Sequence, residues 1–379
     1  MTAIDSKLHD FKPTPAHWSQ EVLSRLADGE FDQAPIIDAS AAHPMSPDLD
    51  VWDAWPLADV SGNPVPWRDG ELWFALAVVR SDDPEGRHHL ARIHHFHRVG
   101  DHFEHLGQTL PDDISPGARQ WSGTARLEGE TITLFFTATG YRGDVSLTYH
   151  QRLFETHTVL AADGIFGTWS TPVEVVEADG AIYRPADENE GEPGKIKAFR
   201  DPSHYRDSDG QDYLLFTASS ATKPSLHDGV IGAAAIDQDG AARLLRPLIE
   251  ATDASNELER PHIVGHAGQL YLFWSTQRGV FAPGIIAPTG LYGATAKSLE
   301  GPWTFLNGHG LVIANPAERP TQAYSWWVLP NLSVTSFVDY WGPEDIAQPE
   351  EATRRARFGG TFAPFVQIAL DGATSRLIG

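Results

Sequence analysis

Five short segments, widely separated along the chain, place acidic, basic, hydroxyl and aromatic side chains next to one another. Two carboxyl groups held close together can share the roles of nucleophile and acid, and arginines beside them can offset their mutual repulsion. A single acid beside tryptophan or arginine is usually an ordinary surface or turn residue, so the argument depends on recurrence. The segments are VWDAWPLAD with Asp53, QWSGTARL with Trp121 and Ser122, AFRDPSHY with Arg200 and Asp201, NELERPHIV with Glu257, Glu259 and Arg260, and TQAYSWWVLP with Tyr324.

Each segment comes just before an apolar, β-branched and aromatic run that predicts a strand. The runs begin at Glu71, Glu130, Gln211, Gln269 and Leu332, and intervals of about 60–80 residues suit a four-stranded propeller blade. Further strand-like stretches follow the runs: ARIHHFH, VSLTYHQ, VIGAAAI, GLYGATA and RFGGTFAPFVQIAL. The absence of crossover helices argues against a parallel α/β sheet. We predict an all-β fold, a five-bladed β-propeller with a funnel-like central pocket; a β-sandwich or a pair of barrels is the alternative.

The first 45 residues differ in texture from the rest of the chain. They are loop-like, with one short helix predicted in HWSQEVLSRLADG and closed by Gly29. We expect residues 1–45 to form an N-terminal extension packed on the propeller, and residues 46–379 to form a single five-bladed catalytic domain.

The predicted fold brings the five segments together. In a propeller the first strand of each blade lines the central channel, so Asp53, Asp201 and Glu259 should face one another at its mouth. Arg200 and Arg260, adjacent in sequence to two of these acids, can compensate the repulsion. One carboxylate and one carboxylic acid in such a pit are what the hydrolysis of a glycoside requires. Nearby tryptophans offer apolar faces to a sugar ring: Trp52, Trp55 and Trp121.

The composition narrows the classes of ligand. The chain has 28 Lys and Arg against 51 Asp and Glu, a net charge of −23, which disfavours nucleic acid and anionic membranes and favours a neutral ligand. It has no cysteine, so thiol nucleophiles and Cys-ligated metals are excluded. No run reaches membrane-spanning length, and neither a P-loop nor a dinucleotide-binding fingerprint is present. We expect no cofactor.

A dense run of histidines spans residues 87–105. As a metal site it would use His95 and His97 on one strand face, with Asp101 or Glu104 nearby. No HExxH-type spacing accompanies them, so we predict instead an outer hairpin of the first blade with a histidine-rich exposed face. The acidic stretch DSDGQD, Asp207–Asp212, lacks the EF-hand pattern and predicts a β-turn. No metal site is predicted.

Together these segments resemble glycoside hydrolase family 68, the levansucrases, inulosucrases and related β-fructofuranosidases. The similar stretches are VWDAWPLAD, WSGTA, FRDP, ELERPH, QAYS with PNLSVTSFVD, and RFGGTFAP, in the family's order from about residue 50 to residue 370. FRDP alone is shared with other five-bladed furanosidases, whereas the combination is specific.

The resemblance implies sucrose cleavage through a fructosyl-enzyme with net retention. Asp53 would attack C2 of the fructosyl unit and must be ionised. Glu259 would protonate the glucosyl oxygen and then deprotonate the acceptor, and Asp201 would stabilise the transition state. The implied substrate-binding residues are Trp52, Trp121, Ser122 and Arg200 around the fructosyl unit, and Glu257, Tyr324 and Arg357 at the glucosyl unit or supporting the acid/base. Arg260 is expected to bind substrate as well.

The same resemblance implies sucrose and fructo-oligosaccharides as partners. It also implies an extracellular location. The first residues lack the apolar core of a signal peptide, so a cytoplasmic location stays open.

Two features depart from the family pattern. Gln277 stands where relatives carry Arg or His near the glucosyl and acceptor subsites. The stretch ATKPSLHDGV replaces a loop that is often much longer. A shortened rim should open the channel mouth, so we expect hydrolysis and short-oligosaccharide transfer rather than long polymers.

Two rival functions remain. An inverting arabinan- or xylan-type furanosidase would hold its acids farther apart than the roughly 5–5.5 Å of a retaining pair. WDAWP and QAYS speak against it. A non-catalytic carbohydrate-binding propeller would keep the tryptophans but could lose Asp53 or Glu259, and this chain has both.

Overall fold

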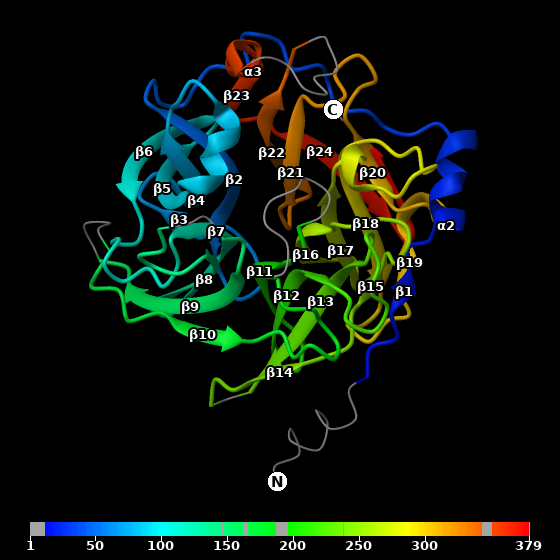
Figure 1. The fold of residues 1–379 in the computed structure, drawn as a ribbon, viewed down its shortest axis with the longest axis horizontal. Helices are drawn as coiled ribbons and strands as arrows, with labels where there is room; N and C mark the ends of the chain where they lie inside the picture. The colour runs from blue at the N-terminus through cyan, green and yellow to red at the C-terminus, as the bar shows by residue number, and fades with distance from the viewer. Residues whose placement is uncertain are drawn as a thin grey trace.

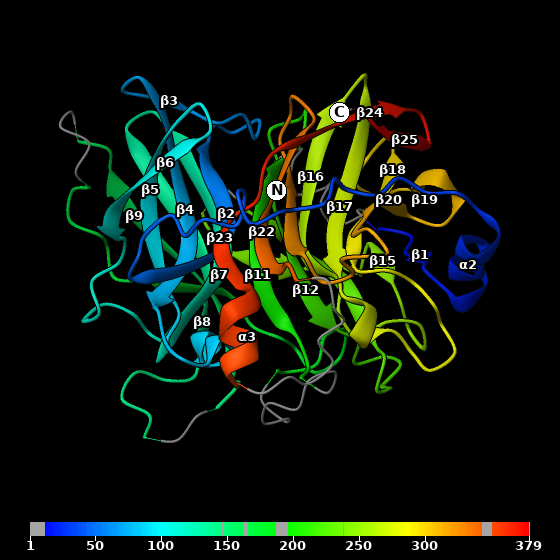
Figure 2. The ribbon, with the colours of Figure 1, turned by 90° about the horizontal axis from the view of Figure 1, so that it is seen from above.

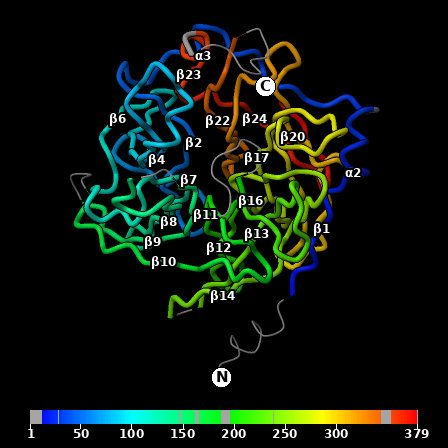
Figure 3. Tube along the Cα trace, in the orientation of Figure 1, coloured from blue at the N-terminus to red at the C-terminus, as the bar shows by residue number. Residues whose placement is uncertain are grey.

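Strands provide most of the regular structure of the computed structural model, which describes residues 12–145, 148–161, 166–186, 196–237, 239–342 and 351–378. They form five antiparallel blades around a centre (Figure 1). The chain visits the blades in order around the ring, as the colours of Figure 3 show. The predicted five-bladed β-propeller is confirmed.

The first two blades share one sheet. Blade I contains β2 (Leu49–Ala58), β4 (Gly70–Val79), β5 (Arg92–Val99) and β6 (His102–Gln108), with β3 (Pro66–Trp67) on β4. Blade II contains β7 (Arg119–Glu128), β8 (Thr131–Thr139), β9 (Gln151–Val159) and β10 (Val173–Val176). The ends of β2 and β7 pair in parallel, which joins the two blades.

The other three blades are separate sheets. Blade III contains β11 (Phe199–Arg206), β12 (Asp212–Ser219), β13 (Gly229–Ile236), β14 (Ala242–Leu244) and β15 (Ile249–Glu250). Blade IV contains β16 (Glu259–His266), β17 (Gln269–Thr276), β18 (Gly290–Ala296), β19 (Thr304–Phe305) and β20 (Leu311–Ala314). Blade V contains β21 (Ala323–Val328), β22 (Ser333–Tyr340), β23 (Phe358–Phe362), β24 (Val366–Asp371) and β25 (Thr374–Leu377).

The core lies between the blades, where side chains from facing sheets pack in layers. Figure 2 shows the blades side by side, seen from above. One layer packs blade III on blade IV, with Leu215, Ile231, Leu272 and Trp274 fully buried. The five apolar runs recognised in the sequence are the second strands of the blades, and both of their faces are covered. This is why they read as nearly continuous hydrophobic segments rather than alternating ones.

One predicted strand is misplaced. β9 begins only at Gln151, the last residue of VSLTYHQ, and residues 148–150 precede it outside any strand, while residues 146 and 147 of the predicted strand lie outside the described residues. The carbonyl of Thr148 accepts a hydrogen bond from the Arg119 guanidinium. That bond ties this part of the connection to blade II outside its ladder.

The N-terminal segment contains the predicted short helix, as α2 (Gln20–Ser24) followed by the 3₁₀ turn η1 (Arg25–Asp28). Ser19 caps it through the Val22 amide at 3.4 Å. Just before it, β1 (Ala16–His17) pairs in parallel with β15 of blade III. Trp18 is fully buried and donates to the carbonyl of His309 at 2.9 Å. The domain boundary at residue 45 stays a prediction.

No helix in the described part of the chain is long and apolar enough to cross a membrane.

Candidate active site

The inner strand of every blade is interrupted at the same place by a one-residue irregularity. The pairing register shifts between Trp52 and Trp55, Trp121 and Gly123, Arg200 and Ser203, Glu259 and His262, and Tyr324 and Trp327. A bulge of this kind bends a strand and turns a side chain that would otherwise face a neighbouring sheet. Each blade therefore presents a pair of consecutive residues at its bulge: Trp52–Asp53, Trp121–Ser122, Arg200–Asp201, Glu259–Arg260 and Tyr324–Ser325.

Four of the five bulges hold a residue in the left-handed region. The φ angles are 53° at Asp53, 58° at Asp201, 53° at Arg260 and 59° at Ser325. For a residue with a side chain this conformation costs of order 1 kcal/mol or more, and such positions cluster at functional sites. The same strained position recurs in four blades, which marks it as a built feature of the channel.

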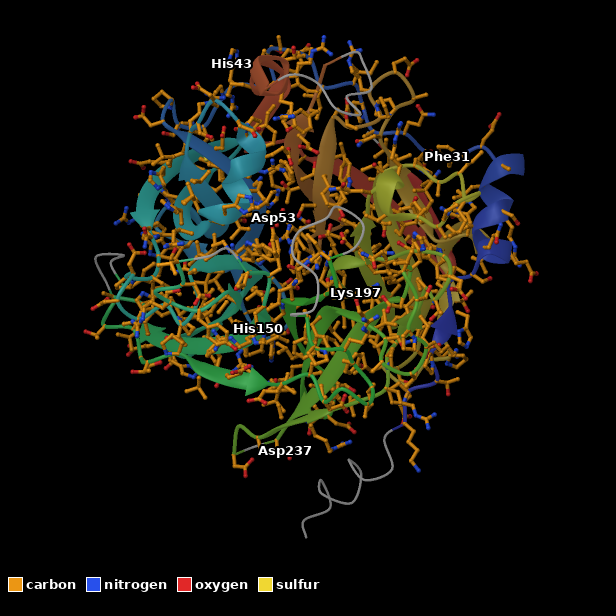
Figure 4. The ribbon with its side chains drawn as sticks, in the orientation of Figure 1. Phe31, His43, Asp53, His150, Lys197 and Asp237 are labelled. Atoms are coloured by element: carbon orange, nitrogen blue, oxygen red, sulfur yellow. The ribbon has the colours of Figure 1, made fainter. Side chains whose placement is uncertain are left out.

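The inner strands contact one another in the order β2, β7, β11, β16 and β21, and β21 contacts β2 again. The dipeptides therefore converge on one centre. Asp53 is labelled there in Figure 4. Its carboxylate accepts a hydrogen bond of 2.5 Å from the Ser122 hydroxyl of blade II.

Asp201 is held by the neighbouring blades. Its carboxylate accepts bonds from the Thr217 hydroxyl at 3.0 Å and from the backbone amide of Arg260 at 3.3 Å. Its own amide donates to Thr137 Oγ1 at 2.9 Å, and that hydroxyl donates to the carbonyl of Ser122 at 3.2 Å. Hydrogen bonds through blades II, III and IV thus fix the position of this side chain.

Glu259 lies among basic and phenolic donors. Arg200 Nη2 is 2.7 Å from Glu259 Oε1 and 3.2 Å from Glu257 Oε2, and the Tyr324 hydroxyl donates to Glu259 Oε2. Burial opposes a charged Arg200, yet the carboxylates of Glu257, Glu259 and Asp201 raise its pKa further above its ordinary value. Arg200 is therefore the fixed positive charge of the cluster.

Arg260 links the catalytic face to blades I and V. Its guanidinium donates to Ser325 Oγ at 2.8 Å and to the carbonyl of Ala54 at 2.7 Å. It also lies 5.0 Å from the centre of the Trp327 ring. Because Ala54 follows Asp53 directly, this side chain helps to hold the strained turn at the candidate nucleophile.

The buried acids retain protons at unusually high pH. Burial raises the pKa of Asp201 to about 7, and the charges of Glu259 and Asp53 add to the shift while Arg200 opposes it. Burial also raises the pKa of Glu257 to about 7, again with Glu259 and Asp201 adding to it. Carboxyl groups that interact this strongly titrate as a coupled set, so Asp201 and Glu257 together retain protons near neutral pH.

Trp52 and Trp121 form the aromatic wall of the site. They contact a segment that the sequence analysis assigned wholly to an outer hairpin. The 3₁₀ turn η2 (Pro84–His89) follows β4 on the side of the channel where β2 begins. The carbonyl of His88 accepts a bond of 3.2 Å from Trp121 Nε1, and its ring stands edge-on to Trp52 with centroids 6.0 Å apart. Burial and the neighbouring Arg87 lower the pKa of His88 to about 3, so its ring is neutral.

His88 and Ser325 are the site residues that the sequence analysis missed. The Asp83–Pro84 step was the available signal for His88, because proline after an aspartate cap begins a helical turn and interrupts a strand. Ser325 lies inside the QAYS motif, next to a residue that was selected.

The remaining part of the histidine run forms the predicted hairpin of β5 and β6, but its histidine face is not exposed. His97 is buried against Trp67, with ring centroids 5.0 Å apart, and His95 packs on Phe166 at 4.8 Å. Trp67 of short β3 and Phe166 cover this face. The predicted turn at Asp207–Asp212 is confirmed, with Asp207 Oδ1 accepting from the amides of Asp209 and Gln211.

Two predicted residues lie on loops rather than on inner strands. Gln277 is exposed, one residue after β17 and two beyond Ser275, which pairs with Glu259. Arg357 is half-buried at the end of helix α3 (Glu351–Arg357), between β22 and β23. In each blade the loop after the second strand leaves at the end where the inner strand begins, so both loops belong to the channel mouth.

Taken together, the fold and site define a propeller whose channel presents a ring of carboxylates, two arginines and an aromatic wall, the features of a glycoside-cleaving enzyme. The family model for levansucrase/invertase matches residues 8–238 and 225–377. The chain belongs to this family, glycoside hydrolase family 68.

Individual relatives agree over nearly the whole chain. A levansucrase of Erwinia amylovora is 30% identical over 98% of this chain and 96% of its own, and an extracellular sucrase of Zymomonas mobilis is 30% identical over 86% and 84%. Among solved structures, the inulosucrase of Halalkalicoccus jeotgali bound to kestose is 33% identical, with a TM-score of 0.88 over 97% of this chain and 96% of that one.

Proposed function

We propose that the protein is a retaining, sucrose-cleaving fructosyltransferase or β-fructofuranosidase that transfers the fructosyl unit to water, sucrose or short fructans. Family membership supports the reaction class. The single observation that supports the mechanism is the convergence of the bulge pairs from five blades, which sets Asp53, Asp201 and Glu259 around one centre.

In the proposed reaction, a carboxylate oxygen of Asp53 forms a bond to C2 of the fructosyl unit. The bond from C2 to the glucosyl oxygen breaks, and that oxygen takes a proton from Glu259 as glucose leaves. Glu259 then accepts the proton of water or of a sugar hydroxyl, which attacks C2 and returns the bonding electrons to Asp53. Each carboxyl group ends in its starting state, as a retaining mechanism requires.

The neighbours of these groups fit the roles. The Ser122 hydroxyl holds Asp53 in one rotamer through its 2.5 Å bond. We assign Asp201, whose carboxylate accepts from the Thr217 hydroxyl and the Arg260 amide, to accept from fructosyl hydroxyls and to face the positive charge of an oxocarbenium-like transition state. We assign Trp52 and Trp121 to the fructosyl pocket, and Glu257, Tyr324, Gln277 and Arg357 to the glucosyl and acceptor side.

A second buried acid, Glu257, lies beside the proposed acid/base. Arg200 contacts both Glu257 and Glu259, and the pKa of Glu257 is raised to about 7, first by burial. A protonated carboxyl group thus lies next to the acid/base at neutral pH, which suits an acid that must start the cycle protonated.

The proposed location is extracellular. The sucrase of Zymomonas mobilis that resembles this chain is described as extracellular, and the net charge of −23 suits a protein that meets neutral sugars in solution.

Incubation with sucrose tests the function. We expect glucose release, with free fructose equal to glucose if water is the acceptor and less than glucose if transfer occurs. Absence of glucose release would refute the proposal. Release of arabinose from arabinan instead would place the protein among the inverting furanosidases.

A further inference from the structure

Beside the carboxylate cluster, one buried ammonium group is surrounded by oxygen atoms. Lys197 lies two residues before β11, and its Nζ is 2.6 Å from Asp228 Oδ1 and 3.0 Å from Asn256 Oδ1. It also donates to the carbonyls of Ser225 at 2.9 Å and Leu226 at 3.1 Å. The Lys197 side chain is 3% exposed and that of Asp228 is fully buried. A lysine surrounded by four oxygens is thus sealed inside the protein.

The ligand chemistry of this cage is that of a hard cation. One carboxylate, one amide oxygen and two backbone carbonyls are the groups that bind calcium in proteins. The second oxygen of Asp228 accepts from Arg184 at 2.9 Å and from the Ser225 amide at 3.3 Å. A buried carboxylate needs a cation next to it. In this cage the cation is the ammonium group of Lys197, which is part of the chain itself.

A short path of contacts joins the cage to the active site. Asn256, whose Oδ1 accepts from Lys197, donates through Nδ2 to Glu257 Oε1 at 3.3 Å. The other oxygen of Glu257 is 3.2 Å from Arg200, which is 2.7 Å from Glu259. The Lys197 charge therefore fixes the amide that orients Glu257.

A second path runs through the backbone. The carbonyl of Lys197 accepts from Gln151 Nε2 at 2.9 Å. The Oε1 atom of the same Gln151 accepts from the Phe199 amide at 3.1 Å and from Arg200 Nη1 at 3.5 Å. Both paths end at Arg200, and the first passes through Glu257, which we assign to the glucosyl side.

We propose that Lys197 is a positioning residue that acts as a built-in cation: it holds Asn256, and through it Glu257 and Arg200, in the arrangement that binds and releases the glucosyl half of sucrose. Lys197 and Asp53 are both labelled on the inner side of the ring in Figure 4. When the side chain is shortened, the cage accepts a calcium ion in place of the ammonium. This inference rests on the proposed function for its kinetic part only.

The test compares Lys197→Ala with Lys223→Ala, a matched variant whose exposed lysine pairs with Glu250 at 3.0 Å. The unfolding temperature, the kcat and KM for sucrose, and the turnover of β-fructosyl fluoride are measured with calcium chloride, with sodium chloride at equal ionic strength, and with EDTA. The fluoride substrate has no glucosyl unit. A loss confined to sucrose therefore separates positioning from a general loss of structure.

We expect Lys197→Ala to lower kcat/KM for sucrose by about tenfold or more, the size of effect seen when groups that orient a site's ligands are removed. Turnover of the fluoride should fall far less. Calcium should raise the unfolding temperature of this variant and recover most of its lost kcat. The wild-type protein and Lys223→Ala should respond neither to calcium nor to EDTA.

Wild-type kcat/KM in Lys197→Ala without added metal would overturn the proposal, as would equal losses on both substrates or a loss that calcium does not recover. If Lys197→Ala is insoluble, Lys197→Gln, which keeps a donor for Asp228, is measured in the same way. If the wild-type protein releases no glucose from sucrose, the proposed function is refuted. Calcium stabilisation of the variant needs no sucrose, so the two failures are distinguishable.

Discussion

Two groups of titratable residues in this propeller show how position in a blade decides chemistry. The acids of the channel are scattered over more than two hundred residues, from Asp53 to Glu259, and yet meet at one centre. The histidines of residues 87–105 are adjacent in sequence, and the hairpin holds most of them on the outer strands of blade I. His94 and His105 even share a hydrogen bond of 2.9 Å. Clustering of titratable residues in the sequence is thus a poor guide to the position of a functional site.

The pKa values of the two groups also shift in opposite directions. Burial raises the pKa of Asp201 to about 7, whereas burial and the nearby His105 lower the pKa of His94 to about 4. In both cases the protein favours the neutral form. In the channel the neutral form keeps a proton within the carboxylate cluster, while in the outer hairpin it only avoids a buried charge.

Replacement of Asp53 should give the largest effect. Asp53→Ala removes the atom that bonds to C2, and we expect turnover of sucrose to fall by at least about 10⁴-fold, as for other covalent nucleophiles. Both glucose and fructose release should be measured. Asp101→Ala, in the exposed turn between β5 and β6, is the control and should keep full activity. Comparable turnover in the two variants would contradict the assignment.

Glu259→Gln should come next. The amide cannot give a proton to the glucosyl oxygen, so kcat for sucrose should fall by about 10²–10⁴-fold. Fluoride needs little protonation to leave, so turnover of fructosyl fluoride should fall much less in this variant. Glu104→Gln in β6 is the matched control. An equal loss of turnover on sucrose and on fructosyl fluoride would show that Glu259 is not the acid.

The stability of the two regions should respond to pH with opposite slopes. The folded protein binds more protons than the unfolded chain at Asp201 between pH 3.8 and about 7, so this group lowers stability as pH rises through that window. At His94 the folded protein binds fewer protons between about pH 4 and 6.5, so stability rises with pH there.

Relative to wild type, Asp201→Asn should therefore gain unfolding free energy as pH rises from 4 to 7. His94→Gln should lose unfolding free energy relative to wild type as pH rises from 4 to 6.5. Urea denaturation at a series of pH values measures both, and the histidine variant should keep its activity. Slopes of the same sign would show that the two regions do not differ as described.

The smallest expected effect lies at the channel mouth. Gln277→His or Gln277→Arg places a cation beside the acceptor side and should raise the ratio of transfer to hydrolysis by about two- to threefold, since rim contacts change partitioning by modest free energies. Excess of glucose over fructose reports the ratio. Gln20→His, on exposed α2, is the control, and an identical product profile in both would remove the assigned role.

Much of this architecture could be predicted from the residues alone. Each apolar run is bounded by polar turns and must bury both faces. Each run is also preceded by a residue pair: Trp-Asp, Trp-Ser, Arg-Asp, Glu-Arg or Tyr-Ser. This recurrence requires a repeated unit whose copies share a common centre. Local pattern and spacing carry that information, because strand formation and blade period depend on near neighbours. The candidate catalytic residues followed from the same repetition.

Tertiary structure alone decided the rest. The bulges that turn Asp53 and Asp201 into the channel, the turn that brings His88 to Trp52, and the oxygen cage around Lys197 all join segments far apart in the chain. ATKPSLHDGV is notable in the sequence only for its brevity, yet it supplies three of the four oxygens of the cage. No local pattern encodes such contacts, because a buried charge is satisfied by whichever backbone carbonyls and carboxylates the packing of the blades brings within reach.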